Sequence, residues 1–292
     1  MKDQFNKGLL LTSLGSFWWG FIGVLYFEYV SFIGHIELVV HRCLWTSVML
    51  LFTTTIFSKW SLFKKIIQNK KDLFGLFISG FLIFTNWAVW IYAVATERII
   101  DASFGYFIMP IISVLLGYIF FKEELNQKRI FSILLVLISI VILIFLNLES
   151  LPWLGLIVAF SWAFYNLVRK KIYVDTDIGL LIESLYILPF ALLTFYFITK
   201  NGLNDFSFTN PGLSFFLILA GPMTVIPLFL YVRGVELIGL GPTGMIFYIT
   251  PTLQFILGYF YYNEDFSIIK FVSFIIIWIA VIIYLKDLYE TN

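Results

Sequence analysis

Charged side chains are scarce in this chain of 292 residues. They make up 13% of the sequence, whereas a soluble domain carries about 25%. Apolar residues make up 61%, which is more hydrophobic surface than a soluble fold of this length can bury. The net charge of +1 is also unlike that of a nucleic-acid-binding protein. We therefore expect an integral membrane protein with no nucleic-acid partner.

Residues that usually carry catalytic chemistry are also few. Cysteine occurs once, at Cys43, which excludes an intramolecular disulfide. The two histidines, His35 and His41, are not part of any metal-ligand motif. The sequence contains no Walker loop for ATP and no GxSxG or Ser/His/Asp arrangement for hydrolysis. These absences predict a protein that is not an enzyme and has neither a metal site nor a cofactor.

Two stretches of the chain resemble each other at an offset of 141 residues. Residues 103–124 and 244–265 align Pro110 with Pro251 and Glu123 with Glu264. Each stretch reads as an apolar helix with a proline near its middle and an acidic exit. We expect the exit residues to be solvated, namely Glu123, Glu124, Glu264 and Asp265. Internal duplication is common in secondary transporters, and it divides this chain into halves at 1–147 and 148–292.

Ten apolar stretches are each long enough to cross a membrane. They run over about 8–30, 35–57, 73–95, 99–121, 129–147, 151–170, 178–198, 213–233, 240–262 and 267–286. We interpret the first stretch as a retained span, because it lacks a signal-peptide cleavage site. The lysine-rich segment 59–71 reads as a turn or short helix at the membrane surface.

The basic residues predict the orientation of these spans. With the N-terminus inside, 15 lysines and arginines lie on the cytoplasmic side and 3 on the outer side, so both termini are expected in the cytoplasm. Five spans per half is an odd number, and the second half is therefore inverted in the membrane. The sequence predicts an all-α membrane protein of ten helices, built from two inverted five-helix repeats that can exchange conformations.

Polar side chains at membrane depth are the first candidates for a binding site. A charged residue at the centre of a membrane helix costs roughly 2.5–3.5 kcal/mol. Arg42 can bind a carboxylate or phosphate through two nitrogens. Beside it, His41 can titrate near neutral pH, and Trp45 lies one turn further on. Alternatively, Arg42 pairs with Glu37 or extends to the membrane surface.

Further candidates lie in both halves of the chain. Glu183 is the repeat mate of Arg42 and either couples protons or forms a structural ion pair with Arg169 or Lys170. Asn86 lies mid-span and either contacts substrate or bonds another helix. For Gln254 and Asn166 we expect a hydrogen bond to another helix. Four aromatic residues can form a cavity wall, with lipid contact or packing as the alternative: Trp90, Tyr106, Tyr165 and Tyr248.

The two repeat-related prolines are candidate hinges. Pro110 and Pro251 each remove one backbone hydrogen bond from an apolar helix and leave a carbonyl oxygen free. We predict a pair of kinked, symmetry-related helices next to a cavity.

Short motifs along nearly the whole chain resemble the RarD family of permeases. They comprise residues 37–42 with Trp45, 86–87, 102–103 with 105–107 and Pro110, 163–165 with 168–171, 181–183 and 251–253. More broadly, the two halves are similar to the EamA module of the drug/metabolite transporter superfamily. The resemblance implies a ten-helix fold with a central cavity, a location in the bacterial cytoplasmic membrane and a drug or metabolite permease.

Together these features predict a secondary transporter, working as an exporter, that moves a small organic solute through a cavity between the repeats. Arg42 and His41 would engage an anionic group of the solute. The alternatives are an uncoupled facilitator or lipid-handling protein, and a scaffold subunit without flux of its own. Expected partners are a small molecule and membrane lipid, with a homodimer as a further option.

Overall fold

The apolar stretches of the chain fold as helices, because a backbone in lipid must satisfy its hydrogen bonds within each segment. The computed structural model describes residues 2–96, 98–147, 153–172, 174–207, 209–261 and 268–291, and within these ranges the regular structure is entirely helical. The first half contains α1 (Lys2–Phe17), the short π-helix η1 (Trp18–Ile22), α2 (Gly23–Tyr29), α3 (His35–Ile56), α4 (Trp60–Gln68), α5 (Lys70–Ala95), α6 (Ile99–Phe121) and α7 (Gln127–Asn147).

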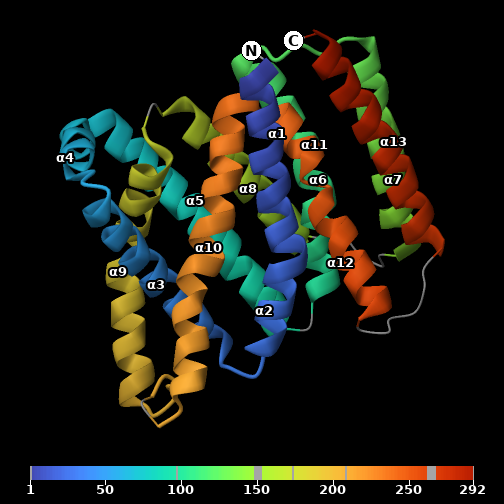
Figure 1. Ribbon diagram of the computed structural model, residues 1–292. Coiled ribbons are helices and arrows are strands. Elements are labelled where there is room, and N and C mark those ends of the chain that lie inside the picture. The colour runs from blue at the N-terminus through green and yellow to red at the C-terminus, as the bar shows by residue number, and fades with distance from the viewer. Residues whose placement is uncertain are drawn as a thin grey trace.

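The second half is also a set of helices (Figure 1). It contains α8 (Trp153–Lys171), α9 (Thr176–Lys200), α10 (Pro211–Ile238), α11 (Leu240–Ile246), α12 (Ile249–Phe260) and α13 (Ile268–Thr291). Each of the ten predicted spans falls on one or more of these helices. The division between the halves lies within residues 148–152, outside the described residues.

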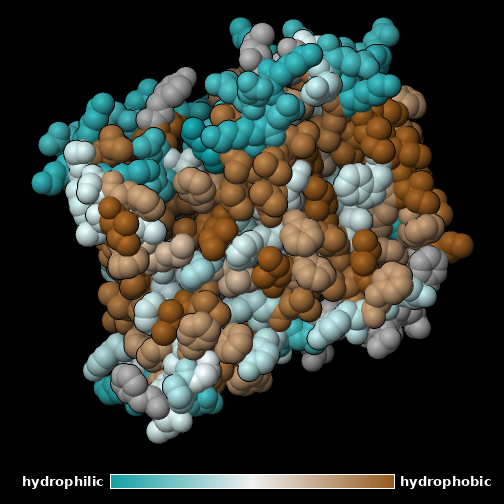
Figure 2. Space-filling model, viewed as in Figure 1, coloured by the Kyte–Doolittle hydropathy of each residue, from teal (hydrophilic) through white to brown (hydrophobic). Residues whose placement is uncertain are grey.

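Within the described residues, seven helical segments are long and apolar enough to cross a membrane. They are Lys2–Tyr29, His35–Ile56, Lys70–Trp90, Phe104–Phe121, Thr176–Lys200, Pro211–Ile238 and Ile268–Thr291. Figure 2 shows a broad apolar band across the molecule, with hydrophilic side chains gathered at the end that carries both termini. A surface with this much exposed hydrocarbon requires lipid, so the chain is a multi-pass membrane protein.

The packing of the helices repeats between the halves. Three contacts join equivalent helices across the halves: α3 packs on α9, α6 on α11, and α7 on α13. Other contacts come in matched pairs, since α1 packs on α10 as α8 packs on α5. The short helix α4 lies at the end of the molecule with the termini (Figure 1), where Lys59 forms an ion pair of 2.6 Å with Asp177 of α9.

The two predicted hinge prolines occupy different environments. Pro110 lies inside α6 and the helix continues through it, so its role as a hinge stays a prediction. Pro251 falls in the first turn of α12, and α11 and α12 are separated one turn before it at Phe247–Tyr248, where the backbone stays right-handed helical. A proline is well tolerated in a first turn, since the first-turn amides have no partner within the helix. The role of Pro251 as a hinge stays a prediction.

The core contains both the lone cysteine and close contacts between the halves. Cys43 is 3% exposed and has no disulfide partner. Gly244 of α11 lies against α6 so closely that a Cβ atom there would come within 3.1 Å of the Pro110 carbonyl oxygen. The two repeat-related segments therefore touch at the predicted proline.

Candidate functional site

A cavity of about 320 Å³ lies between the two halves. Its walls come from η1, α2, α3, α5, α6, α8 and α12. Glu28 and Ser31, at the end of α2 and just after it, are exposed and form its rim. Trp162 and Thr250 are buried and lie at depth. Because α2 ends on the side of the molecule opposite the termini (Figure 1), the cavity opens at that side.

Arg42 supplies the positive charge of the cavity lining. Its side chain is 9% exposed, and its Nε atom donates a hydrogen bond of 2.9 Å to Thr224 Oγ1 of α10. The guanidinium lies 4.4 Å from the ring centroid of Trp87 and 5.5 Å from that of Phe27. Among the described residues no carboxylate lies within ion-pair distance, and Glu37 bonds elsewhere. The predicted alternative of an Arg42–Glu37 pair is therefore wrong.

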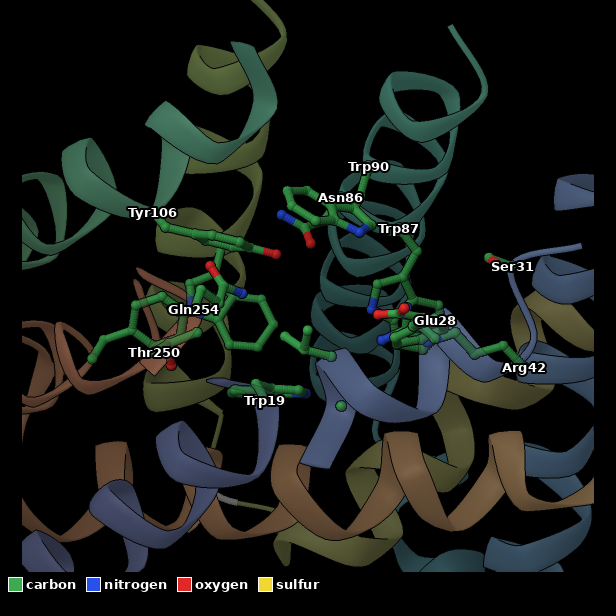
Figure 3. Close-up of a pocket in the computed structure, with 15 residues that line it drawn as sticks. Trp19, Glu28, Ser31, Arg42, Asn86, Trp87, Trp90, Tyr106, Thr250 and Gln254 are labelled. Atoms are coloured by element: carbon green, nitrogen blue, oxygen red, sulfur yellow. The ribbon is translucent and has the colours of Figure 1, made fainter. Parts of the chain in front are cut away.

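Three other predicted residues line the same cavity. Trp90 of α5 and Tyr106 of α6 place their ring centroids 5.1 Å apart. Asn86 donates from Nδ2 to the carbonyl oxygen of Val158 at 2.9 Å and to Ser161 Oγ at 3.2 Å. Asn86 thus bonds another helix, which is one of the two predicted alternatives, and it also faces the cavity; contact with substrate stays a prediction. Figure 3 shows Asn86 and Tyr106 projecting into it.

Several lining residues were not among the predicted ones. They are Trp19, Gly23, Val24, Phe27, Glu28, Ser31, Trp87, Trp162, Phe247, Thr250 and Gln254. Gln254 was expected to bond another helix; instead it faces the cavity, and Asn166 bonds the carbonyl oxygen of Trp162 in its own helix. The aromatic members gave no usable signal, since 20% of the chain is aromatic.

His41 and Trp45 face away from the cavity. Trp45 Nε1 donates to His41 Nδ1 at 3.1 Å, and His41 Nε2 lies 3.4 Å from Glu37 Oε1. The same Glu37 oxygen accepts hydrogen bonds from the backbone of Asp205 and Phe206, and the Phe206 ring packs on His41 at 5.2 Å. This group holds the α9–α10 loop against α3. It does not line the cavity with Arg42.

Glu183 is enclosed by partners and does not line this cavity. Its Oε1 atom accepts a hydrogen bond of 2.5 Å from Ser79 and lies 3.5 Å from Arg169 Nε, while Oε2 accepts one of 3.3 Å from the Tyr165 hydroxyl. The ion pair with Arg169 is one of the two predicted alternatives. The Tyr165 hydroxyl is therefore hydrogen-bonded to Glu183, and Tyr165 is not among the residues that line the cavity. A small void of about 20 Å³ lies beside Glu183, and Trp87 separates it from the main cavity by lining both.

Tyr248 is also buried outside the cavity lining. Its hydroxyl donates to the carbonyl oxygen of Phe107 at 2.8 Å, so it joins the start of α12 to α6. Next to it, Phe247 occupies the break between α11 and α12 and does reach the cavity.

Four aromatic rings close the cavity on the side of the termini. Trp19, Trp162, Tyr231 and Phe247 come from different segments, and every pair among them has ring centroids 5.1 to 6.3 Å apart. The Tyr231 hydroxyl donates to the carbonyl oxygen of Thr243. We call this group the aromatic plug.

Beyond the plug, Glu123 ties three helices together. Its Oε1 atom accepts hydrogen bonds from Lys170 Nζ of α8 at 2.9 Å and from the Leu240 amide at 2.8 Å, and Oε2 accepts one from the Gly241 amide at 2.9 Å. Gly239 has φ +95°, a backbone conformation that favours glycine and turns these amides toward Glu123. The expectation that Glu123 is solvated is therefore wrong. Glu124 is exposed as expected; Glu264 and Asp265 lie outside the described residues.

Comparison with known families and proteins places these features in context. The profile of the EamA-like transporter family matches residues 6–145 and 151–286. Protein RarD of Escherichia coli K12 is 33% identical over 289 residues, covering 99% of this chain and 97% of RarD. An uncharacterized transporter of Bacillus subtilis 168, YojE, is 31% identical over 282 residues, which cover 96% of this chain and 93% of YojE.

More distant similarities extend to another protein named RarD and to a solved structure. A chloramphenicol-sensitive protein RarD of Pseudomonas aeruginosa is 22% identical over 85% of this chain and 83% of its own. One crystal structure superposes with a TM-score of 0.73 at 12% identity, covering 96% of this chain and 98% of its own. The second of these supports the overall fold alone.

Proposed function

The chain belongs to the EamA-like transporter family, and from this premise we propose that it is a secondary transporter that carries a small organic solute by alternating access. The observation that carries the proposal is the cavity between the halves, which combines aromatic walls with one deep cation, Arg42. A pocket with apolar walls and few polar groups is typical of a small-molecule site. The relatives named above are described as transporters or RarD proteins, and no enzymatic role is proposed.

The symmetric packing supports two inverted repeats of five spans each. If each helix is replaced by its counterpart in the other half, the contacts α3–α9, α6–α11 and α7–α13 are unchanged. The contact between α1 and α10 becomes the contact between α8 and α5, which is also present. Two separate matches to the same family profile support the boundary near residue 148. The three predicted spans beyond the seven most apolar helices would then be α7, α8 and the α11–α12 pair.

The two ends of the cavity support an alternating mechanism. One end is open at Glu28 and Ser31, while the aromatic plug and Glu123 close the other. In an inverted repeat, exchange of the conformations of the halves would close the first end and open the second. With the basic end in the cytoplasm, this state is open to the outside of the bacterial inner membrane, and an exporter would release its solute here. Membrane lipid and a homodimer remain proposed partners.

Flux across a sealed membrane tests the proposal. The purified protein would be reconstituted in liposomes loaded with radiolabelled amino acids, nucleosides, organic acids or chloramphenicol. Efflux would be compared with that from protein-free liposomes loaded with the same solute. Val24→Trp places a large side chain in the cavity and should abolish any efflux. Val48→Trp, at a position 44% exposed on α3, is the matched control and should keep it. Efflux unaffected by Val24→Trp would contradict transport through this cavity.

An uncoupled facilitator is the second candidate, and one observation favours it. The predicted proton-coupling residue, Glu183, is held by three side chains outside the cavity, and among the lining residues the only carboxylate is Glu28 on the rim. Efflux measured with and without a pH gradient and a membrane potential separates the two. Efflux that follows only the solute gradient supports the facilitator, and efflux driven by protons supports coupling.

A further inference from the structure

We propose that the substrate is a small aromatic carboxylate, with its carboxylate on Arg42 and its ring among the aromatic walls. This inference rests on the proposed function, since it assumes that the cavity is the solute site. It specifies the charge, the size and the shape of that solute.

The charge follows from the bonding of Arg42. Its Nε atom is taken by Thr224, whereas its two terminal nitrogens have no hydrogen-bond partner among the described residues. A buried cation without a counter-ion is unfavourable, because the desolvation of the charge is not offset by a partner. An anionic ligand supplies the missing partner. Two adjacent N–H groups of a guanidinium match the two oxygens of a carboxylate.

Two aromatic rings lie close to the guanidinium. Trp87 and Phe27 both lie within stacking distance of Arg42, and Figure 3 shows Arg42 reaching toward Trp87. Cation–π contact partly stabilises the charge without using the hydrogen-bond donors of the terminal nitrogens, which therefore can still bind a ligand.

The size and the shape follow from the walls. Seven of the fifteen lining residues are aromatic, namely Trp19, Phe27, Trp87, Trp90, Tyr106, Trp162 and Phe247. Aromatic faces and edges favour a planar ring, which can stack or contact them edge-on. A volume of about 320 Å³ is at the low end for ligand pockets, so it suits one ring or two fused rings with a short acidic arm.

The remaining polar groups narrow the class further. Asn86 uses both amide hydrogens on Val158 and Ser161, which leaves its oxygen free to accept a hydrogen bond from a ligand N–H or O–H. No second cation is among the lining residues, so a phosphate dianion or a dicarboxylate would keep an unpaired charge. Glu28 is exposed on the rim, where water and salt screen its charge.

The test compares ligands that share a ring and differ in charge. Isothermal calorimetry on the purified, detergent-solubilised protein would use 3-phenylpropanoate, 3-phenylpropanamide, 2-phenylethylamine and 3-cyclohexylpropanoate. We expect the aromatic carboxylate to bind at least about tenfold more tightly than its amide, in keeping with a charge-assisted bidentate contact. It should also bind more tightly than the saturated-ring acid. Equal affinity for carboxylate and amide would overturn the proposal.

Variants locate the contact on Arg42. Arg42→Gln should lower the affinity for 3-phenylpropanoate to that for the amide, whereas Arg233→Gln, which changes an arginine 44% exposed outside the cavity, should not. If Arg42→Gln does not fold, the carboxylate–amide comparison on the unmodified protein decides alone. Phenylalanine is a further arm. If it binds more tightly than 3-phenylpropanoate and Glu28→Gln removes the gain, the substrate is a zwitterion and the monoanion proposal is wrong.

The two proposals fail in different ways. Efflux of another solute through the cavity, with no binding of aromatic carboxylates, overturns this inference and leaves transport standing. Binding of an aromatic carboxylate without efflux of any solute supports the cavity chemistry and overturns the transporter.

Discussion

Arg42 and Glu183 lie 141 residues apart and are each the eighth residue of their helices, α3 and α9, yet their surroundings differ sharply. Glu183 is bonded by Ser79 and Tyr165 and paired with Arg169. Arg42 has one neutral partner, Thr224, and borders a cavity. Two helices that pack on each other thus hold two buried charges at the same helix position, one paired within the protein and one without a counter-ion among the described residues.

Local packing explains the difference. At Gly80 of α5, a Cβ atom would lie 3.3 Å from the Glu183 carbonyl oxygen, so α5 and α9 approach closely and the void beside Glu183 is only about 20 Å³. Around Arg42 the neighbours include the rings of Phe27 and Trp87, which lie within cation–π distance of the guanidinium and carry no charge to neutralise it. We infer that Glu183 serves stability and Arg42 serves binding.

The largest expected effect comes from removing the paired charge. Glu183→Ala leaves Arg169 buried without its counter-ion and should lower the free energy of unfolding by about 3–5 kcal/mol. Glu183→Gln keeps the volume and should be milder, because the amide oxygen can still accept the Ser79 bond. Detergent-based thermal unfolding measures both. Unchanged stability in Glu183→Ala would break the comparison, since Glu183 would then not be a structural group.

Removal of the unpaired charge should have the opposite pattern. Arg42→Gln is expected to lower efflux of the substrate by about tenfold or more, equivalent to roughly 1.4 kcal/mol per factor of ten. Its stability should be unchanged or higher, because an uncompensated buried charge is removed. Efflux assays and thermal unfolding on the same preparation check this. Loss of stability comparable to that of Glu183→Ala would show that Arg42 is also structural.

Glu123→Gln should loosen the closed end of the cavity. The neutral side chain loses the ion pair with Lys170 and one of its two acceptor oxygens, which weakens bonds to charged and backbone donors worth about 1–3 kcal/mol. Hydrogen–deuterium exchange at Leu240 and Gly241 should therefore become faster. As the control, Glu124→Gln changes an exposed neighbour and should leave the exchange unchanged. Unaltered protection in Glu123→Gln would show that Glu123 does not hold this end closed.

The smallest effect is expected outside the cavity. Trp45→Phe removes the hydrogen bond to His41 but keeps most of the ring, which should lower stability by about 0.5–1.5 kcal/mol. Ligand affinity should remain unchanged, because neither side chain lines the cavity. Calorimetry with 3-phenylpropanoate distinguishes the two effects. A clear loss of affinity would return His41 and Trp45 to the binding site.

The sequence predicted the helices well because their signal is local. Apolar stretches, a proline inside α6 and the lysine-rich segment at α4 can each be found by reading a few neighbouring residues. The position of Arg42 on the cavity wall was predicted for a related reason: a lone charge at membrane depth requires a polar neighbour or a cavity.

The side chains that face away from the cavity could not be predicted in the same way. His41 directly precedes Arg42, but adjacent residues of a helix point about 100° apart, and only the position of the α9–α10 loop shows which one faces substrate. Similarly, Trp87 and Phe247 cannot be distinguished by sequence from other aromatic residues that contact lipid. The hydrogen bonds of the Glu123 carboxylate could not be predicted either, because they depend on the turn at Gly239. That turn lies 116 residues further along the chain.

The burial of Cys43 has a practical consequence for measuring motion in this protein. A chain whose lone thiol is 3% exposed is close to a cysteine-free background for maleimide chemistry. A cysteine introduced at Ser31, on the rim, would report when that end is open, and one introduced at Leu237, which lies half-buried near Glu123, would report on the end beyond the plug. Opposite changes in their labelling rates upon ligand addition would record the exchange between the two states in real time.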